Sequence, residues 1–104
     1  MTASLVPVFA ALGDETRWRI LAALGEGDAS ASALAARFPV SRQAIAKHLS
    51  VLADVGLVEP LRVGREVRYR VVGSELSAAA RRLDAIGREW EGRLAVIKEI
   101  AERL

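Results

Sequence analysis

The spacing of apolar and polar residues along the first 27 positions predicts two consecutive helices. Residues 5–12, "LVPVFAAL", form a short apolar segment in which Pro7 fits a helix only within its first turn. In residues 13–27, Asp14 is a natural N-cap, Gly25 and Gly27 are stop signals, and an apolar face follows at three-residue spacing from Trp18, Leu21 and Leu24. A mostly helical N-terminal third follows from this pattern.

Residues 30–54 have the pattern of two helices joined by a tight turn. The first, "SASALAARF", can be capped by Ser30 or Ser32 and should end at Pro39, about two turns later. The second begins at Ser41, runs to Asp54 and is closed by Gly56; its buried stripe is Ile45, Leu49 and Leu52. The turn between them is "PVS", so residues 30–54 are predicted to be a helix-turn-helix.

Residues 57–72 are rich in β-branched residues, as strands are. Gly64-Arg65 lies at the middle, and Pro60 suits an edge strand. The second half alternates two kinds of residue, Val67, Tyr69 and Val71 with Glu66, Arg68 and Arg70, which predicts a hairpin with one charged face. The pairing register stays open, because different loop lengths place different residues opposite Tyr69.

Residues 74–104 carry an apolar repeat of seven residues, Leu76, Leu83, Trp90, Ile97 and Leu104, with further apolar positions three and four residues on. A helix of this length spans about 45 Å, more than a domain of this size can cover alone. Two interpretations remain open: a subunit interface in a two-fold dimer with the N-terminal helix of residues 1–12, or a helix folded back on its own domain with a break at Gly87. We predict the dimer, with an interface formed by Leu5, Val8, Phe9, Leu83, Ile86, Trp90, Leu94 and Ile97.

Charge is unevenly distributed along the 104 residues, whose formal net charge is +2. Residues 1–36 sum to −2, residues 37–72 carry seven basic against three acidic side chains, and residues 73–104 balance six against six. The positive charge therefore lies on the helix-turn-helix and the hairpin.

The side of helix 41–54 opposite Ile45 combines small and polar residues, an unusual surface for a helix designed only for solubility. Helix, turn, helix and a basic hairpin, in that order, predict a single winged helix-turn-helix domain, mostly α with a small β-hairpin wing, whose second helix enters a DNA major groove. Arg42 and Gln43 suit bidentate contacts to guanine and adenine, and small Ala46 allows close approach. The predicted DNA-binding residues are Ser41, Arg42, Gln43, Ala46, Lys47, Ser50, Arg62, Arg65 and Arg68.

Two other interpretations of this surface remain: an ordinary solvated face, or a winged-helix module that binds an acidic protein partner. The single histidine, His48, lies on the flank of the helix, where packing or a hydrogen bond is expected rather than base contact.

Several functions are not expected. The chain has no cysteine, one histidine and no catalytic signature, so neither an enzyme nor a bound cofactor is expected. It has no run of eighteen apolar residues and no export signal, which predicts a cytoplasmic protein that does not interact with membranes.

Three segments, "DETRWRIL", "SRQAIAKHLSVLADVGLVE" and "VGREVRYRV", resemble in order and spacing the ArsR/SmtB family of bacterial winged-helix repressors. The resemblance covers nearly the whole chain. It implies a homodimeric transcriptional regulator of a palindromic operator, with recognition at Arg42, Gln43, Ala46 and Lys47 and a wing around Arg62 to Arg68. Ala46 departs from the serine often found there.

The family is best known for metal sensing, and its usual ligands are missing from this sequence. The helix before the recognition helix has no cysteine, and residues 74–104 have no histidine. No metal site is expected, so three alternatives remain: a non-metal ligand, a protein partner or no inducer.

Overall fold

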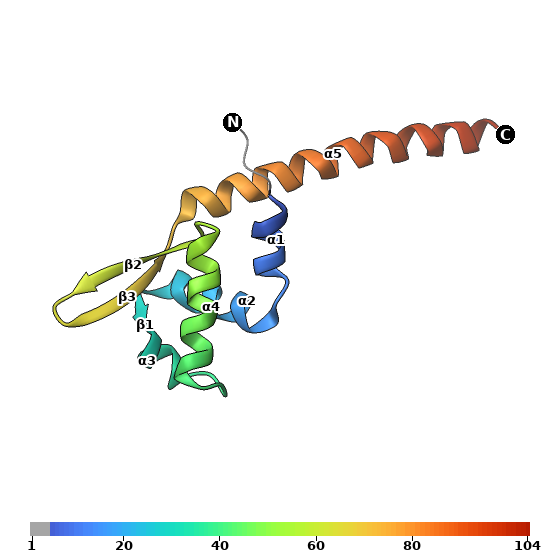
Figure 1. Cartoon of the computed structure of the whole chain (residues 1–104). Helices are drawn as coiled ribbons and strands as arrows, with labels where there is room; N and C mark the ends of the chain where they lie inside the picture. The colour runs from blue at the N-terminus through green and yellow to red at the C-terminus, as the bar shows by residue number, and fades with distance from the viewer. Residues whose placement is uncertain (1–4) are drawn as a thin grey trace.

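The computed structural model describes residues 5–104 and places a small mixed domain at the base of one long helix (Figure 1). The elements follow the order α-α-β-α-α-β-β-α. Their bounds are α1 Val6–Leu12, α2 Glu15–Glu26, β1 Ala29–Ser30, α3 Ala31–Ala35, α4 Arg42–Asp54, β2 Val58–Val63, β3 Glu66–Val71 and α5 Gly73–Arg103. Residues 1–4 of the predicted N-terminal helix lie outside the described residues.

Side-chain caps start the three helices that build the domain. Asp14 Oδ1 accepts a hydrogen bond from the Arg17 backbone N–H at 3.0 Å, and Ser30 and Ser41 each accept one from the N–H three residues on, at 3.1 Å. Ser30, not Ser32, is therefore the cap of α3. Each cap satisfies a backbone donor that the first turn of a helix leaves without a partner.

Of the two predicted stop signals of α2, Gly27 is confirmed and Gly25 is not, and the predicted end of α3 is wrong. The α2 helix continues through Gly25, because glycine weakens a helix without breaking it, and ends at Glu26, where the extended backbone of Gly27 (φ 168°, ψ 149°) leaves the helix. The α3 helix has five residues and ends well before Pro39. Its last turn tightens, since the Arg37 N–H bonds to the Leu34 carbonyl, three residues back, at 2.9 Å.

The sheet is antiparallel with strand order β1-β3-β2, so β2 is an edge strand, as Pro60 requires. Pro60 pairs with Tyr69 and Val63 with Glu66, which fixes the register and leaves Gly64-Arg65 as a two-residue loop. Gly64 has φ +63°, a conformation that favours glycine. The two-residue strand β1, which pairs Ala29 with Tyr69, is too short to show an alternating pattern in the sequence.

Helices α2, α3 and α4 pack around one core, which also contains Leu57, the residue before β2. Its fully buried side chains are Ile20, Leu34, Ile45, Leu49, Leu52 and Leu57. Leu21 and Leu24 are also buried, but Trp18 is 57% exposed, because it lies two residues, or 200°, from Ile20 on α2. The apolar face predicted from Trp18 is therefore correct only for the two leucines.

The α5 helix is unbroken through Gly87 and projects away from the domain (Figure 1). Residues 81–104 are all exposed. The radius of gyration is 18.5 Å, whereas a compact chain of this length has about 13 Å. The helix does not fold back on its own domain, which excludes that alternative.

Candidate nucleic-acid interface

The outward side of α4 carries every residue predicted there. Ser41, Arg42, Gln43, Ala46, Lys47 and Ser50 are all exposed. The opposite side carries Ile45, Leu49 and Leu52, each fully buried. Burial of that stripe fixes the rotation of the helix and so determines which side chains face outward.

A groove of about 430 Å³ lies between α4 and the hairpin. It brings together three predicted DNA-binding residues from distant parts of the sequence, Arg42, Ala46 and Arg65. Sequence reasoning missed its other lining residues, which are Ser30, Ala31, Ser32, Glu66, Val67 and Tyr69.

Arg42 is held in this groove by a side chain of α3. Its Nε donates a hydrogen bond to Ser32 Oγ at 2.8 Å. Within residues 5–104 its other guanidinium nitrogens have no partner, so they remain available as donors. The local sequence around Ser32 gives no signal for this contact, which depends on how the turn places α3 beside α4.

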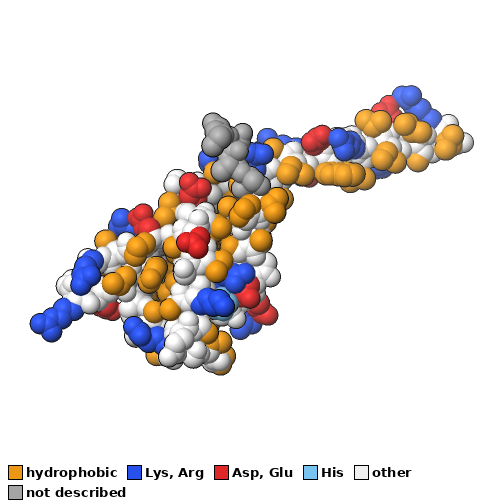
Figure 2. Space-filling model, in the orientation of Figure 1, with side chains coloured by type: hydrophobic (Ala, Val, Ile, Leu, Met, Phe, Trp, Pro, Cys, Tyr) orange, Lys and Arg blue, Asp and Glu red, His pale blue; other side chains and the backbone are white. Residues whose placement is uncertain are grey.

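The basic side chains of residues 37–72 fall into two groups. Arg37, Arg68 and Arg70 have carboxylate partners, at 3.9 Å from Glu26, 3.3 Å from Glu66 and 2.6 Å from Glu59. The other four have no ion pair within the described part of the chain, and we call them the free cations: Arg42, Lys47, Arg62 and Arg65. All four lie on α4 or the hairpin, and Figure 2 shows Lys and Arg side chains at the hairpin tip.

The two faces of the hairpin differ in whether their arginines are ion-paired. Arg62 pairs with Val67, so strand alternation places it on the same face as Val67 and Tyr69, which line the groove. Arg68 pairs with Leu61, so its side chain lies on the opposite face from Arg62, next to its partner Glu66; Glu66, at the loop end of β3, also borders the groove. Of the three arginines predicted for the wing, the structure therefore brings only Arg65 into the groove, with Arg62 on the same face and Arg68 turned away.

His48 lies at the edge of the domain, in a contact with α2. Arg17 Nη1 is 3.4 Å from His48 Nδ1, within hydrogen-bond distance, and Arg17 Nε donates to the Ala11 carbonyl at 2.7 Å. The Arg17 backbone N–H also holds the pKa of Asp14 below its ordinary value of 3.8. The predicted packing role of His48 is thus confirmed, and His48 does not line the groove.

The residues predicted for a dimer interface are mostly exposed in the single chain. Leu83, Ile86, Trp90, Leu94 and Ile97 are between 48% and 58% exposed, and Figure 2 shows hydrophobic side chains along the length of α5.

The N-terminal part of that predicted interface needs one correction. Leu5 and Phe9 are partly buried against the core, whereas Val8 is only 8% exposed because it packs into its own domain, leaving it little surface for a partner. Val96, which is not among the predicted interface residues, is also 55% exposed on α5.

Residues 5–104 contain no group of three or more His, Cys, Asp or Glu side chains arranged to hold a metal ion. None of the helices described here is both long and apolar enough to cross a membrane.

The three-helix core, the exposed recognition-type helix and the two-stranded wing define a winged helix-turn-helix protein. A family model described as "Helix-turn-helix domain" matches residues 12–60. Among solved structures, the chain is similar to an ArsR-like transcriptional regulator from Rhodococcus sp. RHA1, which is 64% identical, with a TM-score of 0.84 over 93% of this chain and 92% of that one. The chain belongs to the ArsR family of transcriptional regulators.

Two further relatives agree with this assignment. The HTH-type transcriptional regulator CmtR of Mycobacterium tuberculosis is 44% identical over 69 residues, which are 66% of this chain and 58% of CmtR. A homodimeric winged helix-turn-helix DNA-binding domain, Mb0332 from Mycobacterium bovis, is 26% identical, with a TM-score of 0.67 over 82% of this chain and 79% of that one.

Proposed function

We propose that the protein is a homodimeric transcriptional repressor that binds a palindromic operator, with α4 in the major groove and the hairpin beside it. The observation that carries the proposal is the position of the free cations. Within residues 5–104, four of the seven basic side chains of residues 37–72 have no carboxylate partner, and all four lie on α4 or the wing. Cations without a carboxylate partner gain most from phosphate contacts, because no ion pair competes with the phosphate.

Sequence preference would come from the first turns of α4. Arg42 and Gln43 can each make two hydrogen bonds to the edge of a guanine or an adenine, and small Ala46 and Ser50 let the helix approach the bases. Lys47, a compact cation on the same side, suits a phosphate oxygen. Backbone and base contacts would thus come from different residues of one helix.

A dimer would place two copies of α4 at a fixed separation. The exposed apolar side chains of α5 require a covering partner, and Mb0332, a relative of this chain, is homodimeric. A two-fold axis through the paired α5 helices would present the two recognition helices to half-sites about 34 Å apart. The operator would then be palindromic.

The test begins with selection of bound sequences from a random duplex pool, followed by measurement of affinity against salt. Each phosphate contact contributes about 0.9 to the slope of log affinity against log salt. The double variant Arg62→Gln/Arg65→Gln removes two free cations and should flatten the slope by up to about 2 units per subunit.

The matched control is Arg68→Gln/Arg70→Gln, which removes the same charge from ion-paired positions and should change the slope much less. Equal slopes for wild type and the Arg62/Arg65 variant would show that the wing does not contact DNA. Failure to enrich any sequence, with salt-dependent binding to an acidic protein instead, would favour an interaction module over a repressor.

A further inference from the structure

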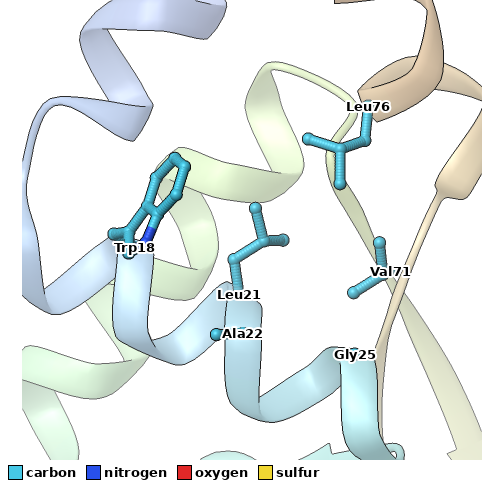
Figure 3. Close-up of a pocket in the computed structure, with 6 residues that line it drawn as sticks. All are labelled: Trp18, Leu21, Ala22, Gly25, Val71 and Leu76. Atoms are coloured by element: carbon cyan, nitrogen blue, oxygen red, sulfur yellow. The ribbon is translucent and has the colours of Figure 1, made fainter. Parts of the chain in front are cut away.

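An apolar pocket of about 250 Å³ lies between α2, the end of β3 and the first turns of α5. Figure 3 shows its six lining residues: Trp18, Leu21, Ala22, Gly25, Val71 and Leu76. The indole of Trp18 forms one wall, and Val71 and Leu76 lie across the pocket from it. None of the six side chains is charged, and none belongs to the proposed DNA interface.

Small residues on α2 keep this space open. Trp18, Ala22 and Gly25 follow one another at i, i+4 and i+7, so they lie on one side of the helix. A Cβ added at Gly25 would meet no atom within 4 Å, so close packing does not require glycine there. The backbone of Gly25 is helical, and alanine is more stable in a helix than glycine by up to about 1 kcal/mol. Glycine at this position therefore enlarges the pocket at the expense of helix stability.

The size and chemistry of the pocket indicate the class of ligand. An apolar cavity of about 150 Å³ binds benzene, so a pocket of this volume can hold a bicyclic aromatic or an aliphatic molecule of similar size. A charged group placed here would lose hydration and gain no partner. We propose that this pocket binds a small uncharged apolar molecule and that this molecule is an effector of DNA binding, the second part resting on the proposed function.

The position of the pocket connects it with the dimer. Trp18 and Leu76 also line a neighbouring hollow of about 310 Å³ that includes Phe9 and Leu83, both part of the proposed interface. A molecule bound between α2 and the base of α5 would favour one angle between the domain and that helix. In a dimer joined through α5, this angle sets the separation of the two α4 helices. A ligand that prefers one angle must therefore change DNA affinity, and DNA must change ligand affinity by the same factor.

Binding is tested on the full chain without DNA, with naphthalene as the probe. Titration is followed by the indole N–H signal of Trp18 in ¹⁵N–¹H spectra, assigned with Trp18→Phe. We expect a saturable shift of this signal and no shift of the Trp90 signal. Gly25→Leu and Ala22→Leu each place a large side chain in the pocket and should abolish the saturable shift. Arg19→Leu, an equally large apolar change at an exposed position of the same helix outside the pocket, should retain it.

Absence of a saturable shift in the wild type, or its persistence in both filled variants, would overturn the proposal. Sedimentation of Gly25→Leu identifies the alternative occupant, because a second copy of the chain seated in the pocket would be displaced and the variant would become more monomeric. That result would also overturn the proposal.

The effector role is tested by operator affinity at saturating naphthalene, which should change by about 5-fold or more. An unchanged affinity would overturn that role. Because the titration needs no DNA, failure of operator binding and failure of the pocket would be seen in separate measurements.

Discussion

Arg42 and Gln43 occupy the first turn of α4 on its exposed side, where their planar hydrogen-bonding groups can reach base edges. We expect Arg42→Ala and Gln43→Ala each to weaken operator binding by about 1 to 3 kcal/mol and to change binding to random DNA little. Fluorescence anisotropy with the selected operator and a scrambled duplex gives both affinities.

Ser32→Ala and Arg37→Ala serve as comparisons for this prediction. Ser32→Ala removes the hydrogen bond that holds Arg42, so it should weaken operator binding in the wild type and have no further effect when combined with Arg42→Ala. Arg37, which pairs with Glu26, should be replaceable with little effect. If Arg42→Ala weakened both duplexes equally, Arg42 would be a phosphate contact.

Ser41 caps α4, and three variants separate this role from the proposed DNA binding. Ser41→Ala should lower the free energy of unfolding by about 1 kcal/mol, measured by urea denaturation. Ser41→Asn and Ser41→Asp keep an acceptor for the Ala44 N–H and should preserve stability. Only Ser41→Asp should lose operator affinity strongly, since its charge repels phosphate. Retained affinity in that variant would place the start of α4 away from DNA.

Among the elements, the starts of α2, α3 and α4 show what the local sequence can predict. Asp14, Ser30 and Ser41 cap their helices through neighbours three residues away, so their patterns are visible in the sequence. The strand register depends on the length of the loop at Gly64. The sequence is compatible with several loop lengths, and the structure has a loop of two residues.

The parts of the candidate site that the sequence did not predict all depend on contacts across the fold. Alternation along β3 already places Arg68 on the same face as Glu66, but which face of the hairpin turns toward the groove follows only from the pairing of β3 with its neighbours. The strand β1, the Ser32–Arg42 hydrogen bond and the place of Tyr69 in the groove join segments 10 to 40 positions apart. No local periodicity reports such contacts.

Two glycines of the domain should respond to alanine in opposite directions. Gly56 follows α4 with φ +80°, a conformation that costs an alanine about 1 to 2 kcal/mol, so Gly56→Ala should destabilise the fold by that amount. Gly25 is helical with open space around it, so Gly25→Ala should stabilise by about 0.4 to 1 kcal/mol. Urea denaturation of both variants gives the signs, and a stabilising Gly56→Ala would contradict the assigned backbone.

At the scale of the whole molecule, we expect Trp90 to link assembly of the proposed dimer with DNA binding. It is 54% exposed in the single chain, where its ring contacts the guanidinium of Arg93 at 5.3 Å from the centroid. Trp90→Ala should weaken the dimer by about 3 to 5 kcal/mol if the side chain becomes fully buried there. Operator affinity should fall as well, although no proposed DNA contact has changed.

Sedimentation at several protein concentrations measures the first effect and anisotropy the second. Glu91→Ala, at the adjacent exposed position outside the predicted apolar stripe, is the control and should leave both unchanged. A Trp90→Ala variant that remained a stable dimer and bound DNA normally would remove Trp90 from the interface.

Because residues 81–104 of α5 are all exposed in the single chain, the proposed pairing surface does not depend on α4, and damage to α4 should leave pairing intact. In a cell that makes both wild-type chain and Arg42→Ala chain, the two would therefore assemble together. Each mixed dimer would contain one subunit that binds DNA normally and one that does not, so it would bind one half-site of a palindrome only weakly. The Arg42→Ala allele should therefore act dominantly and reduce repression by the wild-type chain. Adding Trp90→Ala to the same chain should relieve this effect, because the defective chain would no longer form dimers with the wild type.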